Sequence, residues 1–147
     1  KIVVSGRIKH FISAFGEHVI AKEVEEAMFV ATNATDASVS EFTVAPQIVP
    51  PHNELPYHEW FIEFEKLPSD MDKFINTLDV ALQQQNSYYY DLIVGKVLQT
   101  LKITPVQHGA FMEYMKSIGK LGGQNKVQRL SNDRKIADKI YELQLTK

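Results

Sequence analysis

The residues best suited to bind phosphate lie in a Gly/Lys/Gln-rich segment, residues 119–130, near the C-terminal end of the chain. Lys126 lies in this segment between two further cations, Lys120 and Arg129. A lysine carries a compact charge on a flexible stem, so Lys126 could present a point charge to phosphate oxygens. The alternative interpretation is a solvated loop lysine, because most lysines lie on protein surfaces.

A second segment, residues 6–25, combines cations with a glycine turn. β-branched and aromatic residues predict extended chain from Ile2 up to Gly16, which breaks the strand. Apolar residues then recur at helical spacing and acidic residues fall in the first turn, which predicts a helix over residues 21–35. The segment is therefore predicted to be a strand, a glycine turn and a helix. The apolar positions of the helix are Val24, Ala27, Met28 and Ala31.

Other residue combinations predict no chemistry. The histidines show no paired spacing and no acidic partner set for a metal, so no metal site is predicted. Glu63 and Glu65 lie on one side of a predicted strand, where an exposed, solvated pair is favoured over a general acid and base. No catalytic set is complete within the chain. The five histidines are His10, His18, His52, His58 and His108.

Length and composition limit the possible classes of protein. The chain has 147 residues, of which 44% are hydrophobic, so we expect one domain with a proper core, residues 1–147. A formal charge of −2 gives no basic field, so neither a nucleic acid nor a membrane is a favoured partner. No apolar run approaches the roughly 20 residues of a membrane span. The absence of cysteine fits a reducing compartment, with the cytoplasm as the default.

The remaining pattern predicts a small α+β fold: a mixed or antiparallel three-stranded sheet with an N-terminal hairpin, flanked by about five helices. The middle strand, residues 57–66, alternates in polarity and is expected to be half-buried and antiparallel to the strand before it. Ser69 is the expected N-cap of the next helix, and Asn86-Ser87 could cap the one after it. Strands are expected at 38–49, 57–66 and 98–106, and helices at 69–85, 86–97, 109–118 and after Asn132 or Asp133.

Two motifs at opposite ends of the chain resemble a known family. The spacing G-R-x(4)-I-x(3)-G-x(3)-I-x(2)-E-V-E, residues 6–25, is similar to the motif that opens the C-terminal domain of adenylate-forming enzymes. Within that superfamily the chain most resembles the auxin-responsive acyl-acid amido synthetases and their bacterial relatives. Residues 103–111 and 119–129 resemble that family's strand, G-x-F, helix and loop ending Q-x-K-x-P-R, with Gln128 in place of the proline.

The resemblance implies a role for each candidate residue. Lys126 would neutralise charge on the phosphates as a carboxylate attacks ATP. Arg7 would meet the nucleotide ribose, although a strand-end arginine paired with a surface carboxylate is the alternative. Lys9 stands at the hinge position, where the superfamily usually has an acidic residue. Gly16-Glu17-His18 would swing into the active site for the second half-reaction, although a simple turn glycine is the alternative.

The resemblance also implies a two-domain enzyme of which this chain is the C-terminal lid. In that family a carboxylic acid and ATP give an acyl-adenylate, and an amine or amino acid then displaces AMP to form an amide. ATP and Mg²⁺ would act in the full-length enzyme, together with its own N-terminal adenylation domain, and the fragment alone would bind neither and be inactive. The chain begins without methionine inside a predicted strand, which fits a fragment. The alternative is a stand-alone α+β module that binds a ligand or a protein.

Overall fold

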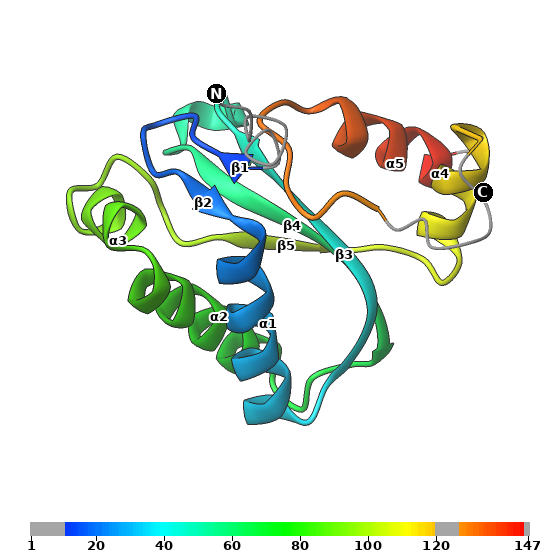
Figure 1. Ribbon diagram of the computed structural model, residues 1–147, viewed down its shortest axis with the longest axis horizontal. Coiled ribbons are helices and arrows are strands. Elements are labelled where there is room, and N and C mark those ends of the chain that lie inside the picture. The colour runs from blue at the N-terminus through cyan, green and yellow to red at the C-terminus, as the bar shows by residue number, and fades with distance from the viewer. Residues whose placement is uncertain (1–10, 120–126, 146–147) are drawn as a thin grey trace, which may run out of the picture.

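The computed structural model describes residues 11–119 and 127–145 of the chain. Helices α1, α2 and α3 cover one face of a central sheet, and α4 and α5 cover the other (Figure 1). No helix in these described ranges is long and apolar enough to cross a membrane. In chain order the elements are β1 (Phe11–Ile12), β2 (Val19–Ile20), α1 (Ala21–Thr35), β3 (Ser38–Gln47), the 3₁₀ turn η2 (Pro51–Asn53), β4 (Tyr57–Lys66), α2 (Met71–Gln85), α3 (Ser87–Val94), β5 (Lys102–Pro105), α4 (Ala110–Ser117) and α5 (Lys135–Leu145).

The sheet topology is that of a mixed α+β fold. The central strand β4 pairs antiparallel with β3 and parallel with β5. A separate two-stranded hairpin is formed by β1 and β2, in which Phe11 pairs with Ile20 and Ile12 with Val19. These observations confirm the predicted fold class, with a three-stranded sheet, an N-terminal hairpin and flanking helices.

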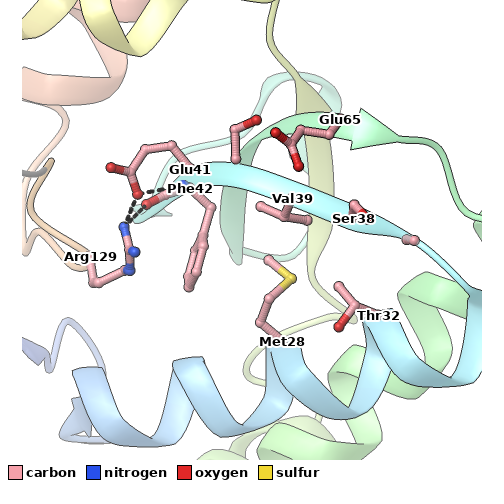
Figure 2. Close-up of a pocket in the computed structure, with 10 residues that line it drawn as sticks. Met28, Thr32, Ser38, Val39, Glu41, Phe42, Glu65 and Arg129 are labelled. Carbon is pink, nitrogen blue, oxygen red and sulfur yellow. Dashed lines mark hydrogen bonds and ion pairs between the residues drawn. The ribbon is translucent and has the colours of Figure 1, made fainter.

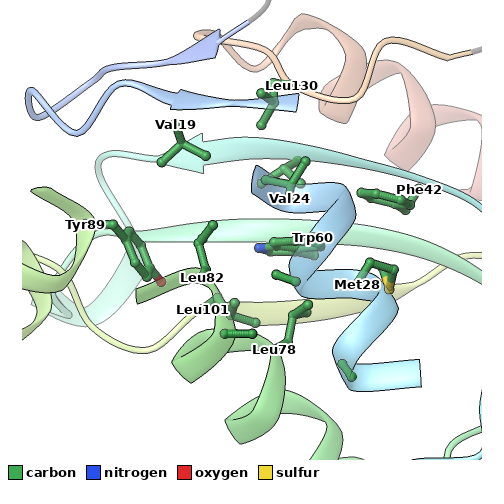
Figure 3. Close-up of a cluster of buried hydrophobic side chains, with 14 of the residues drawn as sticks. Val19, Val24, Met28, Phe42, Trp60, Leu78, Leu82, Tyr89, Leu101 and Leu130 are labelled. Carbon is green, nitrogen blue, oxygen red and sulfur yellow. The ribbon is translucent and has the colours of Figure 1, made fainter. Parts of the chain in front are cut away.

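The larger hydrophobic cluster lies between the sheet and helices α1 to α3. Trp60 on β4 is fully buried at its centre and stacks on Phe42 of β3, with 5.6 Å between the ring centroids. The predicted apolar positions of α1 all face this cluster, because residues three and four apart share one side of a helix. Leu130 enters the same cluster from the segment before α5, as Figure 3 shows.

A second cluster fills the space between the opposite face of the sheet and helices α4 and α5. Phe61 is fully buried there and meets the ring of Tyr141 edge to face, with 5.4 Å between the centroids. The prediction of a half-buried β4 was therefore wrong, since residues 58–63 are buried on both sides. The alternation of polar and apolar residues in the sequence predicted that one face of this strand is exposed to solvent, whereas helices α4 and α5 cover that face.

Some element boundaries also differ from those predicted. Asp70, not Ser69, caps α2 by accepting a hydrogen bond from the Lys73 N–H at 3.2 Å. The N–H of Ser69 instead donates to the carbonyl of Thr35, which ties α2 to the end of α1. Strand β5 is shorter than expected, because the Leu101 N–H donates to a side-chain carboxylate and not to a neighbouring strand.

Candidate functional site

The two motif-bearing segments, far apart in sequence, lie side by side in the fold. The Ser13 N–H, just after β1, donates to Asn132 Oδ1 at 2.8 Å. Leu130 forms a parallel bridge with Val44, and the flanking hydrogen bonds run from the Val44 N–H to the Arg129 carbonyl and from the Ser131 N–H to the Val44 carbonyl. The end of the glycine-containing segment is therefore fixed beside β3 and the N-terminal hairpin.

Three of the predicted site residues, Lys126, Arg7 and Lys9, lie outside the described residues. The described chain resumes at Val127, directly after Lys126, and the Val127 side chain is buried in the second cluster. Gln128 follows, and its carbonyl accepts a hydrogen bond from the Thr43 hydroxyl. The chain is thus anchored to β3 immediately beyond Lys126.

The hairpin turn, residues 13–18, carries the three remaining predicted residues. Gly16 is exposed and has a φ of 89°, a left-handed conformation that strongly favours glycine, and its N–H donates to the Ser13 carbonyl at 3.3 Å. Nothing lies within 4 Å of the position a Cβ would take on Gly16, so only backbone strain opposes a side chain there. His18 is also exposed and left-handed, with a φ of 47°.

Glu17 points into the protein, unlike its two neighbours. Its side chain is fully buried, with Oε2 2.7 Å from His58 Nε2 and Oε1 accepting from the Phe15 N–H at 2.8 Å. Burial opposes ionisation of this carboxyl group, but the hydrogen bond and charge of His58, aided by the Phe15 N–H, hold the pKa of Glu17 below its usual value. The carboxylate is therefore a charged interior group that two partners stabilise.

Asn86 links the hairpin to the junction of α2 and α3. Its amide nitrogen lies 3.0 Å from the Glu17 carbonyl, 3.2 Å from the His18 carbonyl and 3.0 Å from Glu23 Oε1. Its amide oxygen accepts from the Tyr89 N–H at 2.8 Å and so caps α3, as predicted. One side chain thus holds the hairpin, the first turn of α1 and the start of α3 together.

The acid sensitivity of folding offers a test of the Glu17 interaction. Since the pKa of Glu17 is lower in the folded protein, the unfolded chain takes up a proton there first as the pH falls below the usual value of 4.5. The Glu17 contribution to stability is therefore complete above that pH and is lost as the pH falls through the folded pKa. We expect Glu17→Gln to lose less unfolding free energy than wild type between pH 6 and pH 3, measured by urea denaturation. Parallel curves for the two proteins would contradict the assigned ion pair.

Arg129, which flanks Lys126 in the sequence, is engaged within the domain. Its guanidinium forms an ion pair with Glu41 and donates to the Phe42 carbonyl at 3.0 Å (Figure 2). A second ion pair joins it to Glu25 at 3.3 Å. The guanidinium also lies over the Phe42 ring, 4.4 Å from the centroid. This arginine borders a pocket of about 370 Å³ between α1 and β3, which Figure 2 shows with Met28 on its helix side. Arg129 thus has a structural role in joining the glycine-containing segment to α1 and β3.

The G-x-F motif before α4 has a clear conformational basis. Gly109 has a φ of 88°, and its N–H donates to Glu63 Oε2 at 3.1 Å. Two residues later Phe111 is buried in the second cluster. The expectation that Glu63 is exposed was wrong: the residue is 6% exposed, because the loop carrying His108 and Gly109 folds over it. His108 Nδ1 lies 3.6 Å from the same carboxylate oxygen.

Sequence reasoning missed two residues of this region. His58 was considered only as one of five histidines without metal-ligand spacing, and its contact with Glu17 joins residues 41 positions apart, which no local pattern signals. Asn86 was recognised as a helix cap, but its bonds to the hairpin depend on the same tertiary arrangement. Among the described residues no group of three or more His, Asp or Glu side chains is placed to hold a metal ion.

Comparison with known proteins assigns the chain to a family. Residues 22–135 match the GH3 family C-terminal domain. The chain belongs to the GH3 family. Two solved structures share its fold: a GH3.15 acyl acid amido synthetase (TM-score 0.71, 21% identity) and AtGH3.15 acyl acid amido synthetase in complex with 2,4-DB (TM-score 0.69, 17% identity).

Each comparison covers 92% of this chain but 26% of the amido synthetase, so the GH3 domain described here spans about a quarter of the length of those proteins. No curated protein sequence matches the chain significantly. The GH3 family match confirms the resemblance on which the sequence interpretation depended.

Proposed function

We propose that this GH3 domain is the mobile C-terminal domain, residues 1–147, of a larger acyl-acid amido synthetase. The observation that carries the proposal is the family match over residues 22–135, in a fold shared with proteins of which this domain spans about a quarter. The larger protein would join a carboxylic acid to ATP, releasing pyrophosphate, and an amine or amino acid would then displace AMP from the acyl-adenylate. The domain would rotate between the two steps.

The hairpin packs against the segment after Lys126, which supports the proposal that the two regions belong to one site and serve different half-reactions. Lys126 would offer its charge to the phosphates in the first step, and Arg7 would contact the ribose. Lys9 would serve as the hinge, and the Gly16-Glu17-His18 turn would act in the second step. The Ser13–Asn132 hydrogen bond joins the hairpin to the segment before α5, so these two regions would move together when the domain rotates. Glu17 would act from the interior, since its side chain does not reach the surface.

The other substrates would bind mainly outside this chain. No Ser/Thr/Gly loop of the kind that cradles phosphates occurs in the sequence, so the sites for ATP and the acid would lie in the N-terminal domain. Mg²⁺ would accompany the phosphates of ATP and would be held there. The residues contributed by this chain would supply charge and close the site, which is the usual task of a lid.

The proposal is tested with the longer protein and mass spectrometry. Purified protein is incubated with ATP, Mg²⁺, a panel of carboxylic acids and the amino acids, and the mixture is analysed for amide and AMP. We expect at least one acid to give both products in equal amounts. A chain that has no upstream domain, or a longer protein that forms neither acyl-adenylate nor amide from any acid, would contradict the proposal in favour of a stand-alone binding module.

The isolated chain provides a second test. Because most of the nucleotide site would lie in another domain, we expect residues 1–147 to bind ATP with a Kd no tighter than about 1 mM, a free energy of roughly 4 kcal/mol. Isothermal titration calorimetry with MgATP measures this directly, with AMP titrated as a matched control. Micromolar binding by the isolated chain would show that the nucleotide site is here and would refute the lid assignment.

A further inference from the structure

The 13–18 turn holds a defined conformation although its own backbone pairing is slight. Within the described residues β1 and β2 contain two residues each, and an isolated two-stranded hairpin is at best marginally stable in water. The turn also places His18 at a φ of 47°, where a residue with a Cβ is strained by roughly 1–2 kcal/mol. Contacts from the rest of the domain must therefore hold the turn in place.

The holding contacts come from both ends of the turn. Ser13 is bound by Asn132, and Glu17 is bound by His58 on β4 and, through its carbonyl, by Asn86. Exposed Gly16 lies between these two anchors. The anchors thus fix the flanks of the turn and leave its tip accessible.

The Glu17–His58 pair is placed for positioning and not for chemistry. Both side chains are fully buried, so neither can touch a substrate from its present place. The imidazole ring packs on the Tyr89 ring, with 5.2 Å between the centroids, and this contact orients His58 toward the hairpin. A buried ion pair of this kind adds little net stability but fixes a single arrangement of the groups around it.

We propose that Glu17, His58 and Asn86 are positioning residues that hold the 13–18 turn in one preformed conformation for the second half-reaction. This inference rests on the proposed function, because it assumes that the turn enters an active site in the amide-forming step. Loss of an anchor would leave adenylate formation intact and would slow attack of the amine. A misplacement of about 1 Å in a positioning element typically costs about 10²-fold in rate.

The test uses the longer protein with four variants. Glu17→Ala removes the anchor, and Glu17→Asp keeps the charge but draws it away from His58. Glu17→Gln is the conservative rescue, because its amide can still accept from the Phe15 N–H and keep a hydrogen bond to His58 Nε2. Glu26→Ala removes an exposed glutamate from α1 and is the matched control.

Two measurements are made on each variant. Single-turnover kinetics follow acyl-adenylate formation and, separately, amide formation from supplied acyl-adenylate. Hydrogen exchange, followed by mass spectrometry of the peptide covering residues 11–20, reports whether the turn is fixed. We expect Glu17→Ala to slow amide formation about 10²-fold, with adenylation nearly unchanged and with the largest increase in exchange rate in that peptide. Glu17→Asp should change both readouts in the same direction, while Glu17→Gln and Glu26→Ala should resemble wild type.

Three outcomes would overturn the inference. Equal slowing of both half-reactions, or an equal increase in exchange rate throughout the domain, would show that Glu17 only maintains the fold. Unchanged exchange at residues 11–20 in both Glu17→Ala and Glu17→Asp would show that the turn needs no such anchor. If wild type forms no acyl-adenylate with any acid, the proposed function fails and the catalytic part of the inference with it, while the exchange data still decide whether Glu17 fixes the turn.

Discussion

Replacing Lys126 by alanine is expected to slow acyl-adenylate formation by about 10²–10³-fold, or roughly 3–4 kcal/mol of barrier, in the longer protein. The physical reason is the loss of one preorganised charge at the phosphates, which matters only while pyrophosphate is leaving. Amide formation from supplied acyl-adenylate should stay nearly unchanged, because that step would use the 13–18 turn. Rapid-quench measurement of pyrophosphate release and of amide formation separates the two.

The chain offers matched controls for this prediction. Lys120→Ala removes a neighbouring cation from the same segment and should leave both steps close to wild type. Gly16→Ala should show the opposite pattern, a spared first step and a slowed second, since a Cβ at a φ of 89° strains the turn without any steric clash. Wild-type pyrophosphate release by folded Lys126→Ala protein would show that the role belongs to another residue, with Lys120 the next candidate.

Glu59→Ala is expected to destabilise the domain by about 1–3 kcal/mol, because it removes a buried carboxylate together with its hydrogen bonds and its ion pair to the partly exposed Arg134. The Glu59 carboxylate is buried between the sheet and α5, where it pairs with Arg134 at 2.9 Å and accepts hydrogen bonds from the hydroxyls of Thr104 and Tyr141. Burial and the hydrogen bond to Glu59 raise the pKa of Tyr141, so this hydroxyl stays a proton donor at neutral pH. Without Glu59 the Arg134 guanidinium, which lies over the Phe61 ring, loses the carboxylate with which it forms an ion pair among the described residues.

Urea denaturation of the Glu59→Ala variant measures this effect. Glu65→Ala is the matched control, because Glu65 lies exposed on the same strand and its loss should change stability by less than about 0.5 kcal/mol. Since Glu59 holds α5 against the sheet, its loss should also loosen the Asn132 region that contacts the hairpin. Equal stability of the two variants would show that the buried carboxylate contributes no more than a surface one.

The helices could be predicted from the sequence where the local spacing of apolar residues determines them. The buried face of α1 was identified from Val24, Ala27, Met28 and Ala31, because spacing alone decides which side of a helix is apolar. Asn86 was identified as a cap from its position before the α3 residues. Both predictions needed only neighbours within a few residues.

The buried charges could not be predicted in this way. Glu17, Glu59 and Glu63 are charged residues of the kind usually found at the surface. Each is buried because its carboxylate binds a partner far along the chain. These partners are His58 for Glu17, Arg134 for Glu59 and the Gly109 N–H for Glu63. Such pairings depend on the register of β4 and on the second helix layer, which the alternation of a single strand does not reveal. The sequence therefore located the candidate turn but not the anchors that hold it.

The most direct test of the central claim is ATP–pyrophosphate exchange with a carboxylic acid and no amine present. This exchange requires reversible acyl-adenylate formation and is independent of the second half-reaction. We predict exchange that depends on the acid in the longer protein, at least about 10²-fold slower exchange in Lys126→Ala, and none with residues 1–147 alone. Acid-dependent exchange catalysed by residues 1–147 alone, or exchange by the longer protein that is unaffected when these residues are deleted, would contradict the account.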